Sequence, residues 1–295
     1  MMASQYPTLD AAALALLQSW VGRTETLHDD ITAAPVRGLS ATLDRDDAMP
    51  VPGTPLPPLW HWLYFLPQHR QSELGADGHA KLGGFLPPVP LPRRMWAGGR
   101  LEWRQQNPLM VGDAVKRISC IESVTRKTGR TGDLLFVRVR HEVHNQSGLV
   151  LTEEHDIVYR AGAQPGDPSP PPLPAERSAA WQREITPDDV LLFRYSALTF
   201  NGHRIHYDRQ YVTGVEGYPG LIVHGPLIAT LLADLLRRHE PGAFIKRFSF
   251  KALRPTFDLH RFKVNGQPSK DGRSAHLWAD DHEGCLTMQA TAELG

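Results

Sequence analysis

The sequence predicts an α+β protein in which two similar units each combine a helix with an antiparallel sheet. One observation is a run with helical apolar spacing at residues 227–238, which is followed by four strand-like runs. A second is a comparable series of strand-like runs and turns in the first half. A third is the proline-rich segment 161–180 between them. We therefore expect a first unit over residues 1–160 and a second over residues 181–295.

Two helices are expected in the first unit. Alanines and leucines before Trp20 predict a short amphipathic helix, with Thr8 as its possible N-cap. The apolar octet at residues 59–66 has prolines at both ends. An octet of this kind can form a buried helix or a buried strand, and the prolines favour the helix.

The remaining first-unit pattern predicts an antiparallel meander. β-Branched residues with partial alternation indicate a strand at residues 115–124. Glycine-containing turns at residues 127–132 and 145–148 separate it from strands at residues 133–143 and 149–160.

The segment 161–180 cannot supply the hydrogen bonds of a helix or sheet interior, so we expect an extended surface linker. In the second unit, basic residues in the last turn and Pro241-Gly242 end the helix at residues 227–238. Four strands are expected after it, at residues 245–257, 259–265, 275–279 and 285–292. The turn before the last strand resembles the one at residues 145–148, which indicates a weak internal repeat.

Composition and charge are those of a globular protein without a preference for polyanions. The chain is 41% apolar and 22% charged, and its 32 basic and 32 acidic residues cancel. We therefore expect no nucleic-acid partner. No run approaches the ~20 apolar residues of a membrane span, and the first residues lack a basic signal region, so a cytoplasmic location is expected. Cys120 and Cys285 form no CxxC pair and are expected to be buried, reduced thiols.

The densest group of ionisable and hydrogen-bonding residues is R-Y-S-A-L-T-F-N-G-H-R-I-H-Y-D, at residues 194–208. His224-Gly225 follows and opens the apolar helix. This pair of segments resembles the signature of the MaoC-like hot-dog enzymes, Tyr-Ser-x-x-(small)-x-Asp-x-Asn-Pro-x-His-x-Asp. Tyr195, Ser196, His206 and Asp208 match it. Those enzymes add water to acyl thioesters or remove it.

The form N-x-H-x-I-H-x-D is similar to a sub-branch that holds mitochondrial-type 3-hydroxyacyl-thioester dehydratases and itaconyl- or mesaconyl-CoA hydratases. Residues 83–100 also resemble that sub-branch. The resemblance implies a double hot-dog fold, in which each unit is a long helix wrapped by a curved antiparallel sheet. It implies one active site per pair of units, with residues 59–66 and 83–90 along an acyl or CoA tunnel. A further homodimer is possible.

The resemblance implies catalytic roles that one substitution alters. Asn201 stands where the family has aspartate, and an amide cannot act as a base. Proton transfer is therefore expected at His206, with Asn201 orienting water and His203 or Asp208 as second choices. Gly225 is expected to hold the thioester oxygen at a helix N-terminus, although a simple helix cap explains it as well.

Other residues are candidates for substrate contact. Tyr195, Ser196, His203 and His224 lie within or beside the signature, and Arg194 or Arg204 could hold a substrate carboxylate. The CoA phosphates are assigned to basic side chains in two segments, Lys127 and Arg130 beside Arg126, and Lys251 with Arg254.

Further clusters are interpreted as inert. The acidic run at residues 44–47 lacks calcium-loop spacing and predicts a solvated loop. His141 and His144 do not form HExxH and should lie on opposite faces of a strand. No metal and no cofactor other than substrate CoA are expected.

The resemblance implies an enoyl-CoA hydratase for a short branched or dicarboxylic substrate, with itaconyl-CoA or mesaconyl-CoA giving citramalyl-CoA. The alternatives are a 3-hydroxyacyl-CoA or carrier-protein dehydratase, a thioesterase, or a non-catalytic acyl-CoA-binding protein.

Overall fold

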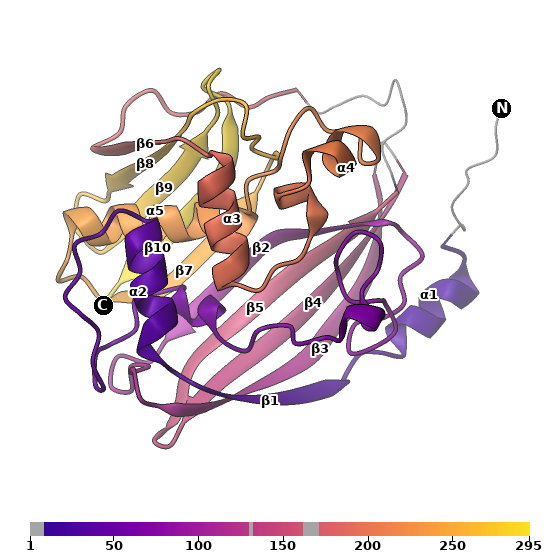
Figure 1. Ribbon diagram of the computed structural model, residues 1–295, viewed down its shortest axis with the longest axis horizontal. Coiled ribbons are helices and arrows are strands. Elements are labelled where there is room, and N and C mark those ends of the chain that lie inside the picture. The colour runs from indigo at the N-terminus through magenta and orange to yellow at the C-terminus, as the bar shows by residue number, and fades with distance from the viewer. Residues whose placement is uncertain (1–8, 130–131, 162–170) are drawn as a thin grey trace.

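The computed structural model of the protein describes residues 9–129, 132–161 and 171–295. Its main feature is a ten-stranded antiparallel sheet with the strand order β1-β3-β4-β5-β2-β7-β10-β9-β8-β6 (Figure 1). The first half contributes β1 (Thr24–Asp30), β2 (Arg93–Trp103), β3 (Ala114–Gly129), β4 (Gly132–Asn145) and β5 (Gly148–Arg160). The second half contributes β6 (Trp181–Ile185), β7 (Ile245–Ala252), β8 (Phe262–Pro268), β9 (Ser274–Asp280) and β10 (Leu286–Leu294).

The two halves of the sheet have the same strand order. In each half the first strand is at the outer edge, and the second strand pairs with the last. The halves meet where β2 pairs with β7, with Gly98 opposite Lys251 and Glu102 opposite Arg247. A Cβ on Gly98 would lie 2.5 Å from the Phe250 carbonyl oxygen, so this junction requires glycine.

The helix expected in the second half is confirmed as α5 (Gly225–His239). It packs against β8, β9 and β10, and its residues from Leu227 to Leu236 are buried. Pro226 at the first turn and three basic residues in the last turn suit its two ends. The helix therefore forms the centre of the larger apolar core.

The prediction of a helix at residues 59–66 is wrong for most of the segment. The segment forms only the four-residue 3₁₀ helix η1 (Trp60–Leu63). Leu59 and Phe65, on either side, have left-handed φ values of 70° and 54°, which end a regular helix. The octet is nevertheless buried, because Trp60, Leu63 and neighbouring aromatic side chains fill the main core.

Several elements escaped the sequence prediction. These are β1, β2, β6 and three helices, α2 (Ala33–Thr42), α3 (Asp189–Leu198) and α4 (Arg209–Gly214). The N-terminal helix α1 (Ala11–Gln18) is confirmed, but its cap is Asp10, whose side chain accepts from the Ala13 N–H. Thr8 lies outside the described residues.

The meander and the second-half strands are confirmed with shifted ends. β7 stops at Ala252, and β8 begins at Phe262. The described part of the linker, residues 171–180, lies on the surface, with Pro174 bridged to Cys285. Both cysteines are free, as expected, but they are half-buried rather than buried.

The acidic run at residues 44–47 is not a simple solvated loop. Asp47 pairs with Arg45 and Arg237, and Arg45 reaches Asp234 of α5 at 2.7 Å. Asp234 also pairs with Arg238 at 2.7 Å. The loop is thus fastened to the last turns of α5 by ion pairs that the sequence alone did not indicate.

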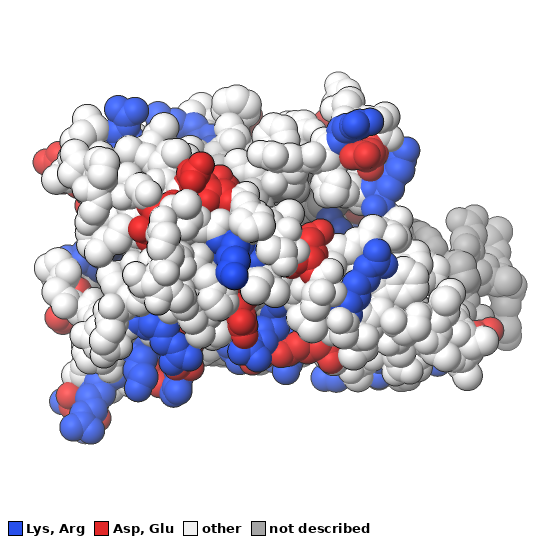
Figure 2. Space-filling view, turned by 90° about the horizontal axis from the view of Figure 1, so that it is seen from below, with Lys and Arg blue, Asp and Glu red and all other residues white. Residues whose placement is uncertain are grey.

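Basic and acidic side chains are interspersed on the face seen in Figure 2. Pairs such as Arg100–Glu154 and Arg138–Asp156 cross neighbouring strands. This agrees with the balanced charge of the chain. Within the described ranges, no helix has both the length and the apolar character that crossing a bilayer requires.

Candidate active site

The signature residues come together where the end of α3, the 3₁₀ turn η3 (Arg204–His206) and the start of α5 meet. Asp188 caps α3 and Asp208 caps α4, so aspartates fix the helices on both sides of the signature. Ser196 at the end of α3 lies 2.8 Å from His224 Nε2, which joins α3 to α5.

The ring of His206 is held in one tautomer. Its Nδ1 lies 2.6 Å from the Ile222 carbonyl oxygen. A carbonyl can only accept, so Nδ1 carries the proton and Nε2 has the lone pair. Burial lowers the pKa of His206 to about 4, so the neutral ring dominates near neutral pH. The ring is stacked on that of His224, with centroids 3.7 Å apart.

Asn201 is held by two hydrogen bonds. Its N–H donates to the Ser196 carbonyl at 2.8 Å, and its Oδ1 accepts from the His203 N–H at 3.0 Å. The side-chain amide nitrogen is therefore the group left to contact water or substrate. His203 itself lies edge-on to His206, with ring centroids 5.5 Å apart.

The N-terminus of α5 provides a polar surface beside these rings. Gly225 begins the helix, where backbone N–H groups lack intrahelical acceptors. A Cβ on Gly225 would have nothing within 4 Å, so there is room for a group to approach the backbone. His224 is buried, which lowers its pKa well below the usual value, and Tyr195 lies edge-on to it.

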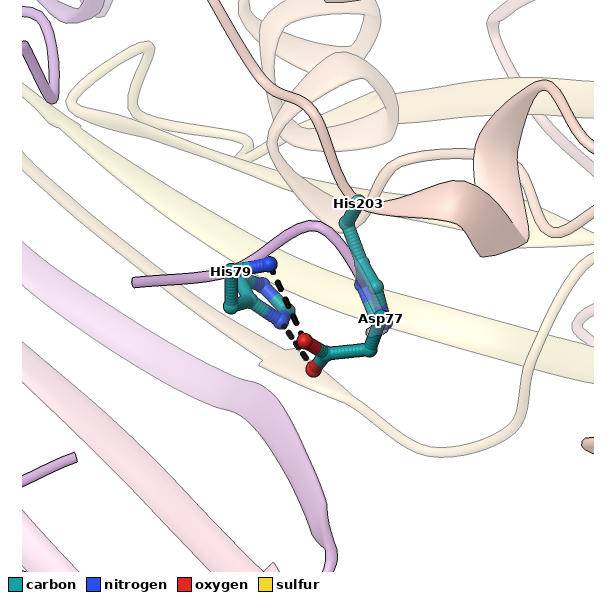
Figure 3. A group of neighbouring side chains, drawn as sticks. All are labelled: Asp77, His79 and His203. Atoms are coloured by element: carbon teal, nitrogen blue, oxygen red, sulfur yellow. Dashed lines mark hydrogen bonds and ion pairs between the residues drawn. The ribbon is translucent and has the colours of Figure 1, made fainter. Parts of the chain in front are cut away.

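Two residues from the first half complete the group, and the sequence analysis missed both. Asp77 and His79 lie in the loop at residues 75–80, which contacts the signature next to His203 (Figure 3). The rings of His79 and His203 have centroids 3.9 Å apart. The pattern Asp-Gly-His in a glycine-containing loop was the available signal, but nothing in the sequence linked it to residue 203.

These three side chains are also of types that bind metals. One ligand atom from each of Asp77, His79 and His203 lies within 4.8 Å of the others. The expectation of no metal did not consider this group, since it forms only in the folded chain.

Neither Arg194 nor Arg204 lies beside the imidazoles as an unpaired cation. Arg204 pairs with Asp208 at 2.7 Å and lies over the Tyr211 ring. Arg194 instead lines a separate cavity of about 350 Å³, together with Arg183. A role for either in holding a substrate carboxylate is therefore not supported by the geometry.

The predicted phosphate-binding residues do not form one cluster. Arg254 lies 3.5 Å from Asp281, and Lys127 lies over the Phe136 ring. Lys127 is on β3 and Lys251 on β7, which are four strand spacings apart, or roughly 19 Å. Arg130 lies outside the described residues.

A second polar cluster is buried in the first half. Glu153 contacts His61 at 3.0 Å and the Trp62 indole N–H at 3.0 Å. Burial would raise the pKa of Glu153, but the His61 hydrogen bond and nearby imidazoles lower it to about 2. His141 faces this cluster and contacts Ser119, whereas His144 contacts Glu142, so the two histidines do separate as expected.

The family follows from comparison with known sequences. A family model described as hydroxyacyl-thioester dehydratase type 2 matches residues 59–258. The chain belongs to this family and is therefore a hydro-lyase of the hydratase and dehydratase type. It is 47% identical to mesaconyl-C(4)-CoA hydratase of Chloroflexus aurantiacus, over 94% of this chain and 97% of that protein. It is 28% identical to the mitochondrial hydroxyacyl-thioester dehydratase type 2 of Schizosaccharomyces pombe, over 86% and 92% of the two chains.

Solved structures agree on the fold. A MaoC-like dehydratase superposes with a TM-score of 0.68 at 15% identity, covering 94% of this chain and 99% of that one. HtdX of Mycobacterium tuberculosis gives 0.63 at 20% identity, with 92% and 99% covered. Another protein of that organism, described as a double hot-dog, gives 0.55 at 15% identity, with 93% and 96% covered. At these identities the likeness concerns architecture alone.

Proposed function

We propose that the chain is a hydratase that adds water to the double bond of a short branched or dicarboxylic enoyl-CoA. Mesaconyl-CoA or itaconyl-CoA would be the substrate and citramalyl-CoA the product. The observation that carries this proposal is the 47% identity to mesaconyl-C(4)-CoA hydratase over nearly the whole of both chains. That relative favours a mesaconyl over an itaconyl thioester.

In the proposed reaction, His206 Nε2 takes a proton from water as its oxygen bonds to the β-carbon. The amide of Asn201 orients that water, and the N-terminus of α5 at Gly225 stabilises the negative charge that develops on the thioester oxygen. Support comes from His206, whose Nδ1 rather than Nε2 is bonded to the Ile222 carbonyl, and from the open space beside Gly225. The 3-hydroxyacyl-thioester dehydratase remains the second candidate, because the family description and the 28% identical relative name that reaction.

Four further assignments accompany the proposal. The boundaries 1–160, 161–180 and 181–295 are proposed as two hot-dog units and their linker, supported by the matching strand orders of the two half-sheets. Within the described residues, the first unit has no helix as long as the fifteen-residue α5 of the second unit. A cytoplasmic location, an acyl-CoA tunnel along residues 59–66 and 83–90, and a homodimer stay predictions.

A comparison of three thioester substrates tests the proposed function. The purified chain is assayed with mesaconyl-C(4)-CoA, itaconyl-CoA and crotonyl-CoA by loss of enoyl-thioester absorbance. We expect kcat/KM for the mesaconyl thioester to exceed that for crotonyl-CoA by at least about 10-fold, because a paired substrate carboxylate adds about 1.5–3 kcal/mol. A preference for crotonyl-CoA would contradict the dicarboxylic substrate and favour the dehydratase. No turnover of any thioester in either direction would favour the binding protein.

Arg94 on β2 is the cation we propose for the substrate carboxylate. Two other arginines of the strand, Arg93 and Arg100, pair with Glu216 and Glu154. Among the described residues, Arg94 has no carboxylate within the 4.0 Å ion-pair limit. Its charge is close enough to His79 and His203 to lower the pKa of each.

Replacing Arg94 with glutamine should therefore reduce kcat/KM for the mesaconyl thioester by about 10- to 100-fold, since a charged hydrogen bond is lost. Activity with crotonyl-CoA should change by less than about 3-fold. Arg100→Gln is the matched control on the same strand, and it should alter neither rate. Equal losses with both substrates would show that Arg94 does not select for the carboxylate.

A further inference from the structure

The loop at residues 75–80 is fitted to the signature through the backbone. The Arg204 N–H donates to the Asp77 carbonyl at 2.9 Å, and the Arg204 guanidinium donates to the Ala76 carbonyl at 3.0 Å. Gly78 has a φ of +88°, and a Cβ there would lie 1.9 Å from the Gly202 carbonyl oxygen. Only glycine permits this approach, so the loop from the first half is placed specifically against the second.

Within this loop, Asp77 holds His79 at two points. Asp77 Oδ2 lies 2.9 Å from His79 Nδ1, and Oδ1 accepts from the His79 backbone N–H at 3.1 Å (Figure 3). The first contact places a proton on Nδ1, so Nε2 is the nitrogen that can exchange a proton with another group. The same arrangement of carboxylate, imidazole and reacting group orients the histidine in Ser-His-Asp hydrolases.

Four imidazoles form a continuous series across the site. His79 lies against His203, His203 lies edge-on to His206, and His206 is stacked on His224. Among the described residues, a carboxylate hydrogen-bonds to His79 but to no other ring of this series. A proton held by the series is therefore most stable on His79.

We propose that the Asp77–His79 pair is a second proton-transfer group of the hydratase site. Asp77 supplies, from the first half of the chain, the carboxylate that Asn201 does not provide. His79 exchanges the proton at Nε2, and Asp77 is a positioning residue that acts through it. This inference rests on the proposed hydration reaction.

The two groups divide the proton transfers. In hydration, His206 takes a proton from water while the water oxygen bonds to the β-carbon. The electron pair of the double bond then forms a C–H bond at the α-carbon with the Nε2 proton of protonated His79, and the N–H bond of the ring breaks. One proton enters at His206 and one leaves at His79, so the substrate gains one water, and proton exchange with solvent restores both rings. In dehydration each step is reversed.

The charges around His79 set the expected pH dependence. Burial lowers the pKa of His79 and Arg94 on β2 lowers it further, whereas the Asp77 carboxylate raises it, so that the pKa lies below its ordinary value but not as low as burial alone would place it. His203 faces it from the signature. Burial raises the pKa of Asp77, but its contacts with His79 outweigh burial and hold that pKa below the usual range, so Asp77 is ionised. Removing the carboxylate should make protonated His79 less stable.

Asp77→Asn and His79→Gln test the pair. We expect Asp77→Asn to lower kcat by about 10- to 100-fold, with KM changed by less than about 3-fold. The alkaline limb of its pH–rate profile should move to lower pH by about one unit, because the opposite charge is gone. The double variant should be no slower than His79→Gln alone, since Asp77 acts through His79. Glu142→Gln is the matched control, because Glu142 contacts His144 away from the site.

Each other outcome is decisive. An unshifted alkaline limb in Asp77→Asn, with wild-type turnover intact, overturns the pair and leaves the hydratase proposal standing. Activity that is lost with a chelator and restored by Zn²⁺ also overturns it, because the three side chains would then be ligands. Should the wild type turn over no thioester, the proposed function fails. NMR titration still tests the pair, and a His79 pKa equal in the wild type and Asp77→Asn rules it out.

Discussion

Replacing His206 with alanine is expected to lower kcat/KM for the enoyl thioester by about 10²–10⁴-fold, the usual contribution of a general acid–base group. The Ile222 carbonyl fixes the tautomer, so the variant loses the lone pair on Nε2 that would accept the proton. Because burial lowers the pKa of His206 to about 4, the wild type should keep its activity on the acid side until the pH falls toward 4. His206→Ala should lack that acid limb.

Imidazole rescue and a control variant distinguish the loss of proton transfer from the loss of packing in His206→Ala. His206 is stacked on His224, so its removal also loses a contact, and added imidazole should restore part of the rate if the lost function is proton transfer. His144→Ala is the control, since His144 lies on β4 beside Glu142. Full activity of His206→Ala, or a loss that imidazole cannot reverse while unfolding stability also falls, would contradict the catalytic role.

The largest effect on stability is expected at Asp234. This carboxylate, 3% exposed, lies within 2.7 Å of both Arg45 and Arg238 and within 3.4 Å of Arg183. Asp234→Ala leaves three guanidinium groups with no common partner, and breaking such a buried network costs about 3–5 kcal/mol of unfolding free energy. Urea unfolding followed by circular dichroism measures the loss.

Asp46 provides the comparison for that measurement. It is exposed in the loop that the same network fastens to α5, so Asp46→Ala should change stability by less than about 0.5 kcal/mol. Asp234→Asn, which keeps the shape, should lie between the two. A loss below about 1 kcal/mol in Asp234→Ala would mean that solvent replaces the carboxylate and that the network does not hold the loop.

The sequence was sufficient where local pattern decides structure. Helix α5 was predictable because a long apolar run follows Pro226 and ends in basic residues. The meander was predictable because β-branched and apolar residues partly alternate in its strands, which lie between glycine-containing turns. His206, Asn201 and Gly225 were located by the resemblance to the family signature, and the structure brings their segments together.

Prediction failed where neighbours distant in sequence decide. The edge strand β1, T-E-T-L-H-D-D, has almost no apolar residues, and its register comes from pairing with β3. In β2 the pair Gly98-Gly99 imitates a turn, yet glycine is needed there because Phe250 approaches closely. The octet at residues 59–66 follows helical composition, but positive φ values at its ends confine the helix to four residues.

The site was incomplete in sequence for the same reason. Asp77 and His79 precede His203 by more than a hundred residues, and only the fold brings them together. For the basic residues, the sequence suggested anion-binding roles that the folded chain does not support. Arg204 and Arg254 were plausible anion ligands by type, but folding gives each a carboxylate of its own chain.

The junction of β2 with β7 has a consequence for how the enzyme responds to dilution. Because both halves of the sheet lie on one covalent chain, loop 75–80 meets the signature as an intramolecular event. The effective concentration of one half relative to the other is set by the covalent chain, so it does not depend on the protein concentration of the assay. Specific activity should therefore stay constant down to nanomolar protein. A fall on dilution would show that a second chain also contributes to the site.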